Sequence, residues 1–237
     1  MFILGCVLTK DSINDKGTYF KPHDLRWGDE TNSSAMVLAI HGYNDYSKSF
    51  EMPANFLTKF NLFVIAFDLR GFGKNNSRGE WFTLERHIND IKNQITKLKK
   101  KYPKKKLYLM GESMGGAILF SLINSNKILP IDGVILIAPA IWNFKKRNFF
   151  KSITLNFFSK IFPNLSLSGK GLIKVQASDN LEILKELSDD PFFIHKPKLK
   201  SLNGITNLMD ESFEDAKNYL KNPTYNTLIL ILSLIHI

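Results

Sequence analysis

The sequence contains one cysteine, Cys6, so no disulfide can form within the chain. No apolar run reaches the roughly 18 residues that a membrane-spanning helix needs. No nucleic-acid-binding motif accompanies the many lysines. These absences argue against a disulfide-stapled scaffold, a membrane span within these residues and a recognisable nucleic-acid module.

The composition is that of a globular protein. The chain has 237 residues, of which 44% are hydrophobic and 23% charged, enough for one α/β domain with a large core. The net charge of +10 includes basic runs at residues 99–101, 104–106 and 145–147. Such charge can attract anionic membranes or nucleic acid, but an ordinary solvated face is the interpretation we favour, and we expect no nucleic-acid partner.

The first six residues, MFILGC, are apolar but too short for a complete signal peptide, and they lack a basic leader. Residues 3–6 resemble the end of a bacterial lipoprotein signal, in which Cys6 would be lipidated and would anchor the protein to a membrane. The alternative is a frayed apolar terminus on a cytoplasmic protein. The sequence leaves both interpretations open.

Several short apolar runs predict strands that are buried on both faces of a sheet. Amphipathic segments at residues 50–60 and 81–102 separate them and predict helices, and residues 18–28 predict short edge strands. Alternating strands and helices predict an α/β fold with a mostly parallel central sheet. The apolar runs are residues 35–40, 62–67, 107–110, 133–138 and 227–232.

The chain is organised around residues 107–120, LYLMGESMGGAILF. An apolar strand leads into G-x-S-x-G, and a helix follows, which is the setting of a nucleophile elbow. Ser113 is the candidate nucleophile on the strained turn. Gly111 and Gly115 leave room for the strand and helix to pass closely, and the Met114 amide is placed to donate to an oxyanion.

The run at 35–40 ends in His41-Gly42-Tyr43. A His-Gly pair after a buried strand resembles the oxyanion loop of α/β-hydrolases, in which the residue after the glycine supplies the second backbone donor. This resemblance assigns that donor to the Tyr43 N–H. His41 is interpreted as structural, because the base of this fold comes after the nucleophile.

Together these motifs resemble the α/β-hydrolases of the serine aminopeptidase and monoacylglycerol lipase group, often called lysophospholipase-like. The matching pieces are residues 41–43, 68–73, 111–116 and 134–140. The resemblance implies an α/β-hydrolase fold with a helical lid, and an acyl-enzyme formed on Ser113. It implies Glu112 as a supporting residue of the elbow motif, no metal and no cofactor.

We expect a division into four parts. Residues 1–30 form an N-terminal segment with edge strands, 31–140 the hydrolase core, 141–223 a lid, and 224–237 the final core strand with a non-native tail. Helices are predicted at 180–187 and 210–220. Aromatic side chains in the lid either cover an acyl chain or form the lid's own packing core, and we favour the second use. They are Trp142, Phe144, Phe149, Phe150, Phe157, Phe158 and Phe162.

The resemblance also implies a catalytic Asp just after the strand at 227–232 and a His one strand later, but the sequence ends first. Because residues 232–237 look foreign to the family, we expect a chain that lacks its C-terminal strands and helices and is inactive or weakly active. No other acid or histidine is assigned as catalytic. Those considered are Asp179, Asp189, Asp190, Asp210, Asp215, His195 and His236.

The leading hypothesis is a serine hydrolase of carboxylic esters, with a small ester or a lipid such as a monoacylglycerol or lysophospholipid as substrate and a membrane surface as a further partner. A peptidase or thioesterase is the nearest enzymatic rival. A non-catalytic binding protein with the same fold is the alternative outside enzymes, and a basic nucleic-acid binder is the third hypothesis. The oligomeric state is left open.

Overall fold

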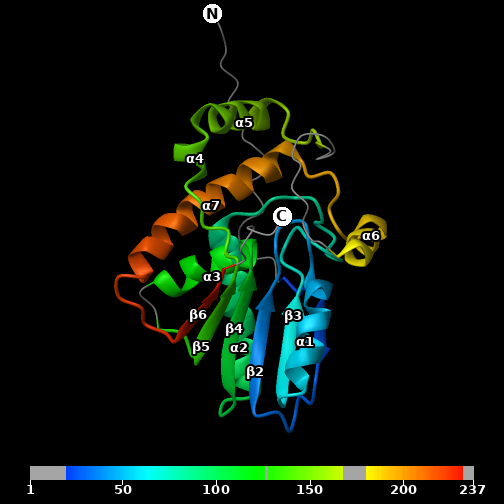
Figure 1. Cartoon of the computed structure of the whole chain (residues 1–237), viewed down its shortest axis with the longest axis vertical. Coiled ribbons are helices and arrows are strands. Elements are labelled where there is room, and N and C mark those ends of the chain that lie inside the picture. The colour runs from blue at the N-terminus through cyan, green and yellow to red at the C-terminus, as the bar shows by residue number, and fades with distance from the viewer. Residues whose placement is uncertain (1–19, 126–127, 168–179, 232–237) are drawn as a thin grey trace, which may run out of the picture.

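The computed structural model describes residues 20–125, 128–167 and 180–231 (Figure 1). The interpretations of Cys6, of Asp179 and of the tail at 232–237, which includes His236, fall on residues outside these ranges. The described residues form one sheet of six strands in the order β1-β3-β2-β4-β5-β6. β1 runs antiparallel to β3, and every other neighbouring pair is parallel.

The apolar runs become strands, as predicted, but the run at 227–232 is not buried on both faces: β6 is an edge strand, and Leu228 and Leu230 are 53% and 44% exposed. All six residues of β2 are buried because helices cover both faces of the sheet. Alternate residues point to opposite faces: Leu38 packs in the cluster that contains Ile91 and Ile118, and Val37 packs with Ala54. The strands are β1 (Asp24–Trp27), β2 (Ala35–Ile40), β3 (Leu62–Phe67), β4 (Lys106–Glu112), β5 (Gly133–Ile137) and β6 (Thr227–Leu230).

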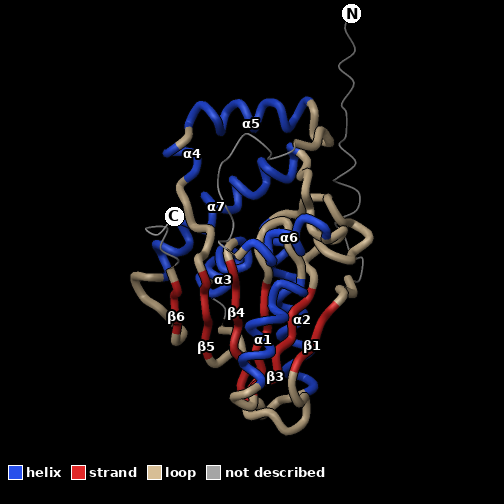
Figure 2. The backbone as a smooth tube through the Cα atoms, turned by 45° about the vertical axis from the view of Figure 1, so that its right-hand side comes forward, coloured by secondary structure: helices blue, strands red, loops and turns tan. Residues whose placement is uncertain are grey.

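The helices pack in two groups. Helices α1, α2 and α3 flank the sheet, while α4 to α7 lie at the carboxyl ends of the parallel strands (Figures 1 and 2). We call this second group the cap. The helices are η2 (Ser47–Phe50), α1 (Glu51–Thr58), α2 (Leu84–Lys101), α3 (Met114–Asn124), α4 (Phe144–Arg147), α5 (Phe149–Ile161), α6 (Leu181–Asp189) and α7 (Leu199–Tyr219).

Two predicted helix starts are wrong. α2 begins at Leu84 rather than at residue 81, because the Thr83 side chain accepts a hydrogen bond from the Arg86 N–H and caps the helix. α7 begins at Leu199 rather than at residue 210. Its early turns bury the apolar residues Leu199, Ile205 and Leu208 at helical spacing, a pattern that the prediction missed, together with the small residues Ser201 and Gly204.

The cap corrects a further prediction. α7 crosses between the strand ends and α5, and it packs against α3 below and α5 above (Figure 1). The aromatic side chains of the cap do not form its packing core: Phe149, Phe150 and Phe157 are 60%, 81% and 57% exposed. The interpretation of these side chains as internal packing is therefore wrong for most of them.

Candidate active site

The first element of the site is the turn between β4 and α3. Ser113 has φ 50° and ψ −112°, a backbone conformation that costs energy for any residue with a side chain. Three backbone hydrogen bonds hold it there. The Ser113 N–H donates to the Ile137 carbonyl at 2.9 Å, and the Ser113 carbonyl accepts from Ala117 at 3.0 Å and Ala140 at 2.9 Å. The end of β5 and the first turn of α3 thus stabilise the strained residue from both sides.

The two motif glycines are required by close backbone approach. A methyl group added at Gly111 would lie 2.7 Å from the carbonyl carbon and oxygen of Gly115. One added at Gly115 would lie 2.1 Å from the carbonyl oxygen of Ile40, the last residue of β2. No side chain fits in these spaces, so α3 can lie this close to β2 and β4 only with glycine at both positions.

The second element is the loop after β2. His41 is fully buried, and the Leu69 N–H donates to its Nε2 at 2.9 Å. Nε2 therefore carries no proton in this bond, and Nδ1–H donates to the Gly42 carbonyl at 2.8 Å. Burial lowers the pKa of His41 to about 4, although the Gly42 carbonyl and the nearby Asp68 oppose this shift. His41 is thus a neutral side chain that joins the loop after β2 to the loop after β3.

This bond also orients the next amide. The Gly42–Tyr43 peptide is trans, so its N–H points opposite to its carbonyl. Because the carbonyl faces the His41 ring, the Tyr43 N–H points away from that ring. Gly42 lies beside the elbow: a methyl group added there would be 3.4 Å from Cβ of Ser113.

The Tyr43 side chain connects the loop to the cap. Its hydroxyl lies 2.9 Å from Oγ of Ser201 on α7, and its ring packs against Phe72 and Trp81. Burial raises the pKa of Tyr43 to about 12, so the phenol stays protonated at neutral pH. Trp81 in turn fills the space above Gly204, where an added methyl group would lie 2.2 Å from the indole. α7 therefore lies directly on the residues that surround the loop.

Two partly buried carboxyl groups, those of Glu112 and Asp45, lie near the elbow. Burial raises the pKa of Glu112, and the Gly42 amide works against that shift. Burial also raises the pKa of Asp45 to about 6; the N–H of Tyr46, at 2.8 Å, opposes this, and the charge of Glu112 adds to it. Asp45 was not among the residues predicted from the sequence. Its position four residues after His41 was the available signal.

Within the described ranges, no histidine is hydrogen-bonded to Ser113. His87 is buried beneath Phe72 and Trp81 with neither ring nitrogen bonded, and burial lowers its pKa to about 3. Nε2 of His195 lies 2.9 Å from the Asp190 carbonyl oxygen.

Most of the aspartates that were considered but not assigned as catalytic accept hydrogen bonds from neighbouring residues. Asp190 accepts from the Tyr46 hydroxyl at 2.6 Å, Asp210 from the Lys145 N–H at 3.1 Å, and Asp215 from the Asn124 side chain at 2.9 Å.

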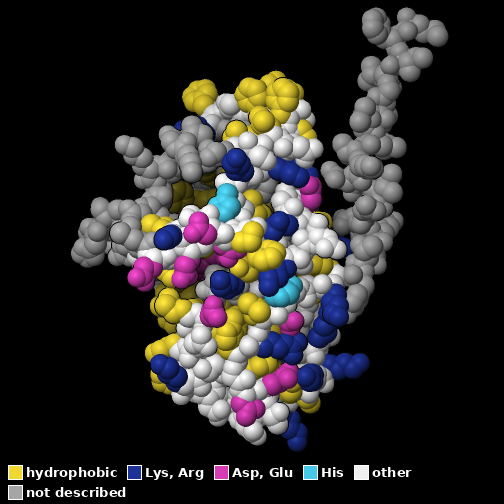
Figure 3. Space-filling view, turned by 90° about the vertical axis from the view of Figure 1, so that its right-hand side faces the viewer, with side chains coloured by type: hydrophobic (Ala, Val, Ile, Leu, Met, Phe, Trp, Pro, Cys, Tyr) yellow, Lys and Arg dark blue, Asp and Glu magenta, His cyan; other side chains and the backbone are white. Residues whose placement is uncertain are grey.

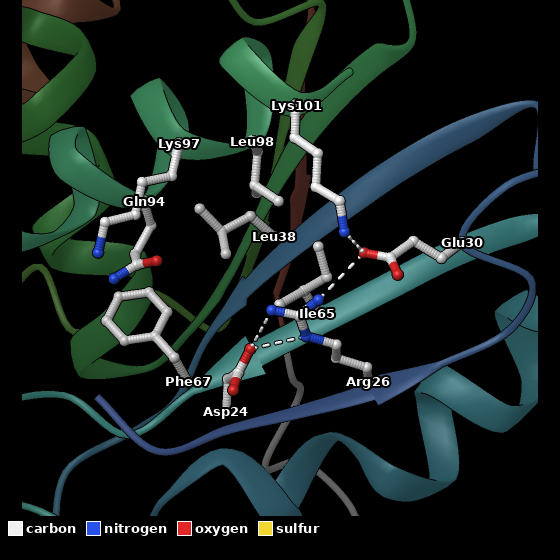
Figure 4. Close-up of a pocket in the computed structure, with 10 residues that line it drawn as sticks. All are labelled: Asp24, Arg26, Glu30, Leu38, Ile65, Phe67, Gln94, Lys97, Leu98 and Lys101. Carbon is white, nitrogen blue, oxygen red and sulfur yellow. Dashed lines mark hydrogen bonds and ion pairs between the residues drawn. The ribbon is translucent and has the colours of Figure 1, made fainter. Parts of the chain in front are cut away.

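A separate hollow of about 130 Å³ lies between the edge of the sheet at β1 and helix α2 (Figure 4). Arg26 bridges Asp24 and Glu30 across it, and Lys101 also pairs with Glu30. None of the residues of the elbow or of the loop after β2 lines it. The described residues contain no cluster of histidine, cysteine or acidic side chains suited to a metal ion. None of their helices is long and apolar enough to cross a bilayer.

The sheet order, the helices on both faces and a strained serine after the central strand define an α/β-hydrolase fold. Solved structures agree. A monoacylglycerol lipase from Paleococcus ferrophilus superposes with a TM-score of 0.69 at 20% identity, covering 90% of this chain and 89% of that one. A soluble variant of the Saccharomyces cerevisiae monoglyceride lipase superposes with a TM-score of 0.71 at 18% identity, covering 90% and 74%.

A comparison of the sequence with family models assigns the chain to one family within this fold. Residues 31–231 match the serine aminopeptidase S33 family, and the chain belongs to it. Human monoglyceride lipase is 29% identical over 145 residues, which are 60% of this chain and 47% of the human protein. Phospholipase YtpA of Bacillus subtilis is 22% identical over 191 residues, 80% of this chain and 72% of that protein. The chain spans about half the length of the first of the curated relatives it matches.

Proposed function

We propose that this protein is a serine hydrolase of lipid-derived carboxylic esters, of the monoacylglycerol or lysophospholipid type. The observation that carries the proposal is Ser113 in a strained conformation between β4 and α3, beside the loop that His41 orients. Several relatives named as monoglyceride lipases support an ester of this class.

In the proposed reaction, Oγ of Ser113 attacks the ester carbonyl and loses its proton to a general base. The tetrahedral oxyanion is held by the backbone N–H groups of Tyr43 and Met114, each worth roughly a hundred- to a thousandfold in rate. Met114 is the first residue of α3, so its N–H has no partner within the helix. The alcohol departs with a proton, and water then releases the fatty acid from Ser113.

The general base and the acid that orients it are assigned to no described residue, because no described histidine is bonded to Ser113. We therefore expect the 237-residue chain by itself to be inactive or weakly active. The same observation favours a second candidate, a non-catalytic protein that uses the fold to bind an apolar ligand.

A fluorophosphonate probe separates the two candidates, applied to protein produced from the complete gene and to this chain in parallel. We expect saturable labelling of the complete product that is abolished in Ser113→Ala. Ser125→Ala, which removes a hydroxyl at the far end of α3, serves as the matched control and should label normally.

Absence of labelling in the complete, folded product would contradict the hydrolase assignment and favour the binding protein. Substrate class is tested with the same preparations on a monoacylglycerol, a lysophospholipid and an aminoacyl anilide. Faster cleavage of the anilide would replace the lipid ester with a peptidase substrate.

A further inference from the structure

Most apolar side chains of helix α5 point away from the rest of the protein, whereas a helix that packs on its own domain usually turns them inward. Its least exposed residues are Ser152, Leu155 and Ser159, which are spaced three and four apart and so share one face. Because α5 packs along α7, this mostly small and polar face is the one turned toward the molecule. Packing within the chain therefore uses little of the helix's apolar surface.

The opposite face is apolar and open to solvent. Phe149, Ile153, Phe157 and Ile161 recur every four residues, and all are at least half exposed. Figure 3 shows hydrophobic side chains gathered at the end of the molecule where α5 lies in Figure 1. We call these four residues, together with the adjacent Phe150, the outer face of α5. Contiguous exposed apolar surface of this kind marks an interaction site.

The stretch of sequence that contains α5 carries charge of one sign. No acidic residue occurs between Asp132 and Asp179, whereas the same stretch contains seven lysines and arginines. That stretch accounts for +7 of the net charge of +10. Lys145 lies 4.0 Å from Asp210, but Lys146, Arg147, Lys151 and Lys160 form no ion pair within the part of the chain that the structure describes.

We propose that the outer face of α5 docks on an anionic lipid bilayer, with its phenylalanines in the interface and the neighbouring cations against lipid phosphates. Aromatic and aliphatic side chains on one face, with lysines at its margins, are the features of a helix that lies in the plane of a membrane interface. A second copy of this chain would bring the same cations together, so like charges oppose that occupant.

Docking through α5 would fix the orientation of the protein relative to the membrane. α7 lies between α5 and the strand ends, so the membrane contacts the cap and the carboxyl edge of the sheet faces the same side (Figure 1). The elbow at Ser113 is at that edge. The proposal does not depend on the chemistry of Ser113, and Ser113→Ala should bind vesicles like the wild type.

Sedimentation with vesicles of phosphatidylcholine, with and without phosphatidylglycerol, tests the apolar part. The variant is Phe149→Ser with Phe157→Ser. Its control is Phe60→Ser with Phe56→Ser, which removes two phenylalanines of matched exposure, 60% and 57%, from the α1 region instead. We expect the first pair to weaken partitioning by at least about tenfold, and the control by less than about twofold.

The charged part is tested in the same assay. Lys146→Gln, Arg147→Gln and Lys151→Gln together should abolish the preference for phosphatidylglycerol and flatten the salt dependence. The control replaces Lys100, Lys104 and Lys106, an exposed basic group at the opposite end of the sheet. It should keep both the preference for phosphatidylglycerol and the salt dependence.

Absence of vesicle binding by the folded wild type, or equal losses in variants and controls, would overturn the proposal. So would a wild type that elutes as a dimer, becomes monomeric in the Phe149→Ser and Phe157→Ser variant and binds no vesicles. That result would make the outer face a self-association surface. Circular dichroism of each variant verifies that it is folded.

Discussion

At the turn that carries Ser113, buried neighbours surround a strained backbone, whereas at α5 large apolar side chains face solvent. The strain at Ser113 is offset inside the chain, by hydrogen bonds to β5 and α3 and by the close packing of Gly115 against Ile40 of β2. The exposed phenylalanines of α5 have no comparable compensation among the described residues. Contacts within the chain therefore stabilise the strained turn, whereas the exposed apolar side chains of α5 are the basis for the proposed docking on a membrane.

The comparison predicts its largest effect at Gly115. Gly115→Ala places a methyl group 2.1 Å from the Ile40 carbonyl oxygen, so the strand and helix must separate. We expect a loss of at least about 5 kcal/mol in the free energy of unfolding, measured by chemical denaturation. Gly79→Ala is the control, since Gly79 also resists substitution, with φ 86°, but has no atom within 4 Å of the added methyl group.

Because only its backbone conformation is strained, Gly79→Ala should cost about 1–2 kcal/mol. Equal losses of stability at the two glycines would mean that the close contact with Ile40 is not the reason why the elbow requires glycine at position 115.

A pair of phenylalanines sharpens the comparison between core and cap. Phe120 on α3 is fully buried, whereas Phe150 on α5 is 81% exposed. Phe120→Ala should lower the free energy of unfolding by about 3–5 kcal/mol because it leaves a cavity. Phe150→Ala should change it by less than about 0.5 kcal/mol. A large loss at Phe150 in urea unfolding would place that side chain in the folded core and contradict its assignment to an interaction surface.

The smallest expected effect concerns the carboxyl group of Asp45. Its folded pKa is about 6, against an unfolded value near 3.8, so between these values the folded state binds more protons than the unfolded state. Stability from this group therefore falls as pH rises from about 4 to about 6.5. Asp45→Asn has no such proton to lose, and it keeps an oxygen that can accept from Tyr46.

The stability of Asp45→Asn relative to the wild type should therefore increase by about 1–2 kcal/mol across that pH range and then level off. Thermal unfolding at a series of pH values measures this difference. His41 and His87 titrate in the opposite sense, but they are present in both proteins and cancel in the comparison. A difference that is constant with pH would show that Asp45 is ionised normally.

The parallel sheet and the strained turn could be read from the amino-acid order. Continuous apolar runs become strands because a strand covered on both faces needs apolar residues at every position, as in β2. Gly111, Ser113 and Gly115 mark their turn through their spacing, although only the contact of Gly111 with Gly115 is local. Gly115 packs against Ile40, and Ser113 is hydrogen-bonded to Ile137 and Ala140 as well as to Ala117.

Other features were decided only by tertiary structure. The proximity of Asp45 to Glu112 and the contact of Tyr43 with Ser201 join residues far apart in the chain. Tertiary packing also decided which face of α5 is buried: α5 packs along α7 with Ser152, Leu155 and Ser159 least exposed, and its phenylalanines face solvent. A local pattern records what a residue prefers, whereas its neighbours across the fold determine whether that preference is met.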